Sequence, residues 1–177
     1  MRRVYFDNNA TTPVLPEVLQ AMQPYFSEHF GNASSIHHHG QETRAAVERA
    51  RESVASLLGC RSSEIVLTSG GTEGDNLAIF GLVRTGDHVI TSNIEHHAVL
   101  NSCKRLQESG CEVSYIQVDG RGLVDPDDVR RALRPNTKLI TIMMANNETG
   151  VIQPVEEIGK IAAEADVYFH TDAVQAA

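Results

Sequence analysis

Apolar residues recur along the chain with two different spacings. Helical spacing, with apolar positions on one face of each segment, predicts helices over residues 16–29, 38–58, 72–83, 97–109, 127–133 and 154–165. Short apolar runs between polar turns predict strands over residues 64–68, 87–91, 112–118, 138–143 and 167–170. From the first of these strands onward, strands and helices alternate, which is typical of βαβ units.

This alternation predicts an α/β fold in which a mainly parallel sheet is covered by helices on both faces. The run Leu139–Met144 is apolar except for Thr141, as expected of a strand that is buried on both faces. In such sheets ligands bind outside the carboxyl ends of the strands. The loops that follow the strands are therefore the candidate sites.

The length and charge limit the possible functions. The chain has 177 residues, the length of one ordinary domain, and 41% of them are hydrophobic, which excludes a disordered chain. Its 15 Lys and Arg residues against 23 Asp and Glu residues give a net charge of −8, which argues against binding to nucleic acid. The most apolar stretch, Leu139–Ala145, is too short to span a bilayer.

The cysteines and the start of the chain indicate the compartment. Cys60, Cys103 and Cys111 form no C-x-x-C pair and are typical of reduced thiols. The first residues carry two arginines but no apolar segment of the kind a secretory signal needs. We therefore expect a cytoplasmic protein that does not bind a membrane.

The first candidate loop, Thr68–Asn76, joins a predicted strand to a predicted helix. Its glycines would let the backbone approach a ligand closely, and the free N–H groups of a helix start attract an anion such as a phosphate. The spacing matches neither a P-loop nor the dinucleotide fingerprint. A plain helix start is an equal alternative, with Thr72 and Asp75 as a capping box.

Three further loops place polar side chains after predicted strands. His96 could stack on a ring or transfer protons, or simply cap the next helix. Asn146 and Asn147 supply amides or form a plain turn. Asp172 directly follows a buried strand, where a carboxylate is costly unless it has a partner, and it could instead cap a helix.

The histidines do not have the spacing of a metal site. Neither His96 and His97 nor the run His37–His39 forms a zinc-binding motif, so we expect no metal. A phosphate cradle, a stacking imidazole, an amide and a carboxylate at successive strand ends instead suit a phosphorylated aromatic ring with a protonated nitrogen. Pyridoxal 5′-phosphate has these properties, and an Asp that keeps its nitrogen protonated makes the ring an electron sink.

The chain resembles the cysteine desulfurases of the class V aminotransferase family, which are fold type I pyridoxal-phosphate enzymes. Six motifs in the family's order carry the resemblance, and they lie at Tyr5–Pro13, Phe30–His37, Thr68–Glu73, Glu95–Leu100, Asn146–Gly150 and His170–Gln175. Any one of these motifs alone would be weak, but six in sequence form a strong signal.

The resemblance implies roles for individual residues. Gly71 and Thr72 would bind the cofactor phosphate. His96 would stack on the pyridine ring and act in acid–base catalysis, and Asp172 would hold the ring nitrogen.

The resemblance also places Asn147 and Gln175 near the phenolic oxygen of the cofactor. It also implies a division into domains. Residues 1–15 would pack with a C-terminal small domain, and residues 16–177 would form part of the cofactor-binding large domain.

The implied reaction converts L-cysteine to L-alanine and passes sulfur to an enzyme persulfide for iron–sulfur cluster or other sulfur biosynthesis. A homodimer and sulfur-acceptor or scaffold proteins are the implied partners. The Schiff-base lysine and the persulfide cysteine of the family have no counterpart among Lys104, Lys138, Lys160 and the three cysteines. We therefore expect the front half of such an enzyme, inactive alone.

Two alternatives stay open. Selenocysteine lyase or another class V aminotransferase would share these motifs, because most of them serve the cofactor rather than the substrate. A truncated, non-catalytic chain that survives as a binding remnant would explain the missing lysine, but the intact cofactor loops disfavour it.

Overall fold

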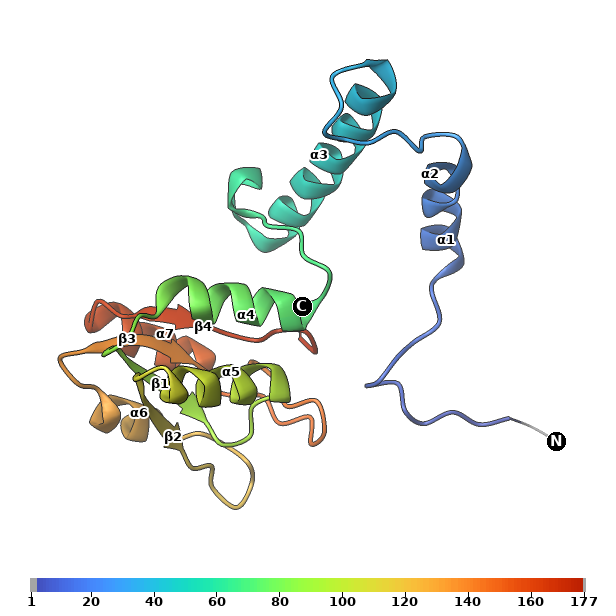
Figure 1. Cartoon of the computed structure of the whole chain (residues 1–177). Helices are drawn as coiled ribbons and strands as arrows, with labels where there is room; N and C mark the ends of the chain where they lie inside the picture. The colour runs from blue at the N-terminus through green and yellow to red at the C-terminus, as the bar shows by residue number, and fades with distance from the viewer. Residues whose placement is uncertain (1–2, 177) are drawn as a thin grey trace. The chain divides into compact units, whose positions relative to one another are not determined.

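A computed structural model describes residues 3–176 of the chain. These residues fall into two compact units, a first unit that ends at Leu67 and a second that begins at Thr68 (Figure 1). Each unit is described by itself. The predicted division at residue 15 stays a prediction.

The first unit is helical. Its elements are α1 (Pro16–Met22), α2 (Pro24–Ser27), α3 (His38–Leu58) and a short 3-10 helix η1 (Ser62–Glu64). The single helix predicted over residues 16–29 is wrong, because Pro24 has no N–H to continue the hydrogen-bond ladder and starts a new helix instead.

Helix α3 has the predicted bounds because both of its ends are capped. The Nδ1 atom of His37 accepts a hydrogen bond from Gly40 N at 3.4 Å, and Gly59 ends the helix in the left-handed conformation at φ 69°. The histidine run therefore begins a helix.

Two glycines allow the segment before α3 to lie against its first turn. A Cβ atom on Gly31 would stand 2.3 Å from the carbonyl oxygen of His39, and one on Gly40 would stand 2.3 Å from that of Ser35. Both neighbours are backbone atoms, which cannot rotate away. The glycines of this motif therefore serve a close backbone approach.

We predict that Gly40→Ala loosens the start of α3, with an overpacking cost of about 1–3 kcal/mol. Hydrogen exchange followed by mass spectrometry should show faster exchange in peptides covering residues 31–45. Gly81→Ala is the control, because its Cβ would meet no atom within 4 Å. Unchanged exchange in the Gly40 variant would contradict the steric argument.

The second unit alternates helices and strands. In chain order they are α4 (Gly71–Leu82), β1 (His88–Ser92), α5 (His97–Glu108), β2 (Glu112–Ile116), α6 (Pro126–Ala132), β3 (Thr137–Thr141), α7 (Val155–Glu164) and β4 (Tyr168–His170). The strands form one parallel sheet in the order β2-β1-β3-β4. The predicted α/β fold with a parallel sheet is confirmed.

Helices cover both faces of this sheet (Figure 1). Val89 and Leu139 pack with α4 and α5 on one face, whereas Ile90 and Ile140 pack with α6 and α7 on the other. Successive strand residues point to opposite faces, and both faces are apolar here because both are covered. The resulting core holds the strand ends, and the loops that follow them, in place.

The strand predicted over residues 64–68 is wrong. Ser62–Glu64 forms η1, and Ile65–Leu67 is extended but pairs with none of the described strands. Its apolar residues fit a strand, but a strand also needs a neighbour for its N–H and C=O groups. Within the described residues, no helix is long and apolar enough to cross a membrane.

Candidate functional site

The site lies at the carboxyl edge of the sheet, where the chain order reverses. After β1 the chain runs to β2 on one side, whereas β3 lies on the other side of β1. At this switch point Asn93 N donates to Ile116 O of β2 at 3.0 Å, so the chain that follows β1 stays with β2 and departs from β3. Ligands of open α/β sheets bind at such a point.

The start of α4 contributes main-chain N–H groups to this edge. Gly70 is its N-cap residue and provides no side-chain cap. The alternative of a capping box is wrong, since Thr72 and Asp75 both lie inside the helix. A Cβ on Gly71 would stand 2.8 Å from Val174 Cγ2, so the turn after β4 closely approaches this helix start. An uncapped helix start with exposed Thr72 is suited to bind an anion.

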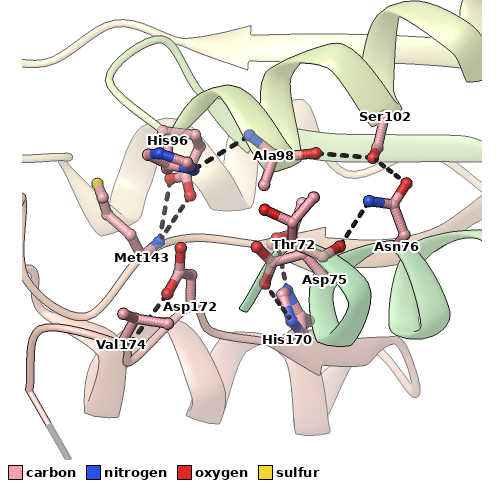
Figure 2. Close-up of polar contacts among 12 residues, drawn as sticks. Thr72, Asp75, Asn76, His96, Ala98, Ser102, Met143, His170, Asp172 and Val174 are labelled. Carbon is pink, nitrogen blue, oxygen red and sulfur yellow. Dashed lines mark hydrogen bonds and ion pairs between the residues drawn. The ribbon is translucent and has the colours of Figure 1, made fainter. Parts of the chain in front are cut away.

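His96 stands at the start of α5. Its Nδ1 accepts a hydrogen bond from Ala98 N at 3.2 Å, and the residue is exposed (Figure 2). The capping interpretation is therefore confirmed, and it orients the ring, since Nδ1 faces the helix. With Nδ1 as the acceptor, Nε2 is left for a ligand or a proton.

Asp172 follows β4 and is 9% exposed. Its Oδ1 accepts from Val174 N at 3.0 Å (Figure 2). Its main-chain carbonyl accepts from Met144 N at 2.9 Å. A turn follows it in the described residues, and the helix-cap alternative stays open. The segment after β3 therefore holds the main chain of Asp172, and the turn after β4 holds its carboxylate.

The two asparagines differ in their surroundings. Asn146 is buried, its Nδ2 donates to Ile94 O at 3.0 Å, and its Oδ1 accepts from the main chain of Glu148 and Thr149. This side chain therefore organises the loop and joins it to the loop after β1. Asn147 is half-buried, and its role stays a prediction, as does that of exposed Gln175.

Two acids and a histidine at this edge were not predicted to be site residues. Asp75 on α4 is 5% exposed, and its Oδ1 lies 3.6 Å from Nε2 of His170 (Figure 2). The Nδ1 atom of His170 lies 2.8 Å from the hydroxyl of Thr141. Burial, and then the charge of Asp172, raise the pKa of Asp75 to about 6, whereas burial lowers that of His170.

Glu95 is the second missed acid, and it is 5% exposed. Burial raises its pKa to about 7, opposed by hydrogen bonds from Ser92 and Met143 and supported by the charges of Asp172 and Asp75. Glu95, like Asp172, is a carboxylate that follows a buried strand. The same signal in the sequence therefore points to it. Three acidic side chains therefore lie close together at this edge.

The lysines lie elsewhere. Lys104 is exposed on α5, Lys138 Nζ lies 4.9 Å from the centre of the Tyr168 ring, and Lys160 pairs with Glu156 on α7. A cationic group bound among the acids would relieve their mutual repulsion. The edge therefore suits a ligand with a phosphate at one end and a cationic ring nitrogen at the other.

A parallel α/β unit with an uncapped helix start, an imidazole and a buried carboxylate at one edge has the groups that a phosphorylated, cationic ring requires. The chain belongs to the Aminotransferase class-V family, whose sequence pattern matches residues 4–177. The resemblance to this family is confirmed. Family membership implies pyridoxal phosphate as the cofactor, which fits these donors and acceptors.

Named relatives agree with this family. The cysteine desulfurase IscS of Dictyoglomus turgidum is 56% identical over 98% of this chain and 45% of its own length. That of Methanosarcina thermophila is 54% identical over 99% of this chain and 44% of its own length.

Solved structures agree as well. One described as SspA in complex with cysteine has a TM-score of 0.94 and 45% identity, over 97% of this chain and 51% of its own. A NifS-like protein has a TM-score of 0.93 and 42% identity, over 98% of this chain and 49% of its own. The chain thus spans about half the length of these relatives.

We predict that Glu95 makes stability depend on pH. Its folded pKa of about 7 lies above the ordinary value of 4.5, so the folded state holds the proton more tightly, and raising the pH through this range favours unfolding. Between about pH 4.5 and 8 the free energy of unfolding should fall by up to about 3 kcal/mol relative to Glu95→Gln. Urea unfolding of both proteins measures this difference, and parallel pH profiles would contradict it.

Proposed function

We propose that this chain forms the cofactor-binding part of a pyridoxal-phosphate-dependent cysteine desulfurase. The observation that carries the proposal is the common position of the uncapped start of α4, the capping imidazole His96 and the buried carboxylate Asp172 at one edge of the sheet. The reaction converts L-cysteine to L-alanine and passes its sulfur to an enzyme persulfide.

Each end of the cofactor would meet its own group of residues. Gly71 and Thr72 would bind the phosphate, because their N–H groups lie in the first turn of a helix without a side-chain cap. Asp172 would accept a hydrogen bond from the protonated ring nitrogen, and Asn147 and Gln175 would lie near the phenolic oxygen. When bound, the cofactor supplies an electron sink for a carbanion.

His96 would stack on the ring and transfer protons. Its Nδ1 accepts from Ala98 N, so the neutral side chain carries its proton on Nε2. In this tautomer Nε2 would donate a hydrogen bond to the ligand, and proton transfer would require Nδ1 to give up its bond to Ala98 N and take up a proton. The cap orients the ring with Nδ1 toward the helix, which leaves Nε2 on its other side.

The reaction also needs a cysteine that accepts the sulfur and a lysine that forms the Schiff base. Burial raises the pKa of Cys103 to about 12 and also raises that of Cys111, so neither thiol is suited to form a persulfide. We propose that the sulfur-accepting cysteine and the Schiff-base lysine correspond to positions in the other half of the relatives.

Substrate and partners follow the same proposal. A structural neighbour is described in complex with cysteine, which supports cysteine as the substrate. The whole protein would act in the cytoplasm as a homodimer and would deliver sulfur to acceptor or scaffold proteins. The net charge of −8 is consistent with partners other than nucleic acid.

A chimaera tests the activity. Joining residues 1–177 to the matching remainder of the Dictyoglomus turgidum desulfurase should give an enzyme that releases sulfide from L-cysteine in the presence of a thiol. The same chimaera with Asp172→Asn should lose at least about a hundredfold in kcat, since the ring nitrogen then lacks its charged partner. A folded, cofactor-loaded chimaera that releases no sulfide would contradict the proposal.

Binding tests the site in the chain itself. Pyridoxamine 5′-phosphate carries the phosphate and the ring but no aldehyde, so it binds without a lysine. Asp172→Asn should weaken its binding by about tenfold or more, because a charge-assisted hydrogen bond is lost. The matched control is Asp127→Asn, an exposed residue in the first turn of α6. Equal affinities of the two variants, measured by calorimetry, would argue against the assigned role of Asp172.

A further inference from the structure

The main-chain N–H groups that follow β3 alternate between two neighbours. Ile142 N and Met144 N donate to the carbonyl oxygens of His170 and Asp172, on the β4 side, at 3.1 and 2.9 Å. Met143 N therefore points to the opposite side, toward β1, as alternation in a parallel strand requires. The chain that follows β1 has turned toward β2 by this point, and it offers Met143 no carbonyl.

Glu95 takes the place of the missing carbonyl. Its two carboxylate oxygens lie 3.0 and 3.1 Å from Met143 N, and Oε1 accepts from the hydroxyl of Ser92 at 2.5 Å. The side chain thus closes a gap between two strands that have separated. A buried N–H without an acceptor would cost about 1–3 kcal/mol, so this contact stabilises the separated arrangement.

The same contact connects the two sides of the candidate site. Glu95 is covalently joined to His96, its carboxylate binds Met143 N, and the next N–H along the chain binds the carbonyl of Asp172. One carboxylate therefore stands between the imidazole that caps α5 and the carboxylate that follows β4.

We propose that Glu95 is a positioning residue, which sets the spacing between His96 and Asp172 by bridging Ser92 and Met143 across the gap between β1 and β3. The proposal rests on the proposed function, because the spacing matters only if a ring lies between these two residues. Glu95 itself touches main chain and a hydroxyl, and it acts on a ligand through its neighbours.

A second hydrogen bond should hold the two loops together when Glu95 is changed. Asn146 Nδ2 donates to Ile94 O at 3.0 Å and so joins the same two loops independently. Among the described residues, the hydrogen bonds of Glu95 go to Ser92 and Met143 and not to Gly71 or Thr72, which would bind the phosphate. Removing the bridge should therefore disturb the ring end of the site and leave the phosphate end unchanged.

Three variants separate the effect of the length of the Glu95 side chain from the effect of its charge. Glu95→Gln keeps the length and can still accept from Met143 N, Glu95→Asp keeps the charge but is one methylene shorter, and Glu95→Ala removes both. Glu157→Ala, an exposed acid on α7, is the control. Binding of pyridoxamine 5′-phosphate and, separately, of inorganic phosphate is followed by NMR titration of the 177-residue chain.

The Ala and Asp variants should bind pyridoxamine 5′-phosphate at least about tenfold more weakly, with phosphate binding changed by no more than about twofold. The Gln variant should stay within about threefold of the unchanged chain. Equal weakening of both ligands, or unchanged binding in the Ala and Asp variants, would overturn the positioning role. An unchanged chain that does not bind pyridoxamine 5′-phosphate would instead overturn the proposed function, and this inference with it.

Discussion

The hydrogen bond from Met143 N to the carboxylate of Glu95 allows two neighbouring strands to separate without leaving a buried donor unsatisfied. Strands β1 and β3 pair up to Thr91 and Thr141, and beyond this point the chain after β1 turns toward β2. An opening at the carboxyl edge needs such a separation, because a continuous ladder would fill it with backbone. The positions of His96 and Asp172 follow from how the two separated segments are held.

The charges at this edge lower the stability of the folded chain. Asp75, Glu95 and Asp172 are all nearly buried, and burial with mutual repulsion raises the pKa of the first two. A core selected for stability alone would not gather three acids. A site that binds a cation would gather them, since each acid strengthens the negative electrostatic potential at the cation. The uncapped start of α4 supplies the complementary positive end for a phosphate.

Much of this arrangement could be predicted from the sequence, because it depends on local patterns. The apolar spacing predicts helix α3 with the bounds that the structure has, and His96 and Asp172 can be singled out in the sequence because they follow apolar runs. The strand predicted over residues 64–68 does not form, because strand pairing depends on a neighbouring strand that local spacing does not reveal. The contacts of Glu95 with Met143 and of Asp75 with His170 depend on the strand order, since they join segments that are distant in sequence.

We propose that the carboxyl edge of this sheet holds one ligand at both of its ends. Amide chemical-shift mapping of the chain with pyridoxamine 5′-phosphate tests it most directly. The account predicts that the amides of Gly71 and Thr72 shift together with those around His96 and Asp172, while Glu112 and Thr137 at the opposite edge stay unchanged. Shifts confined to the opposite edge, or to the helix start without the other two segments, would contradict it.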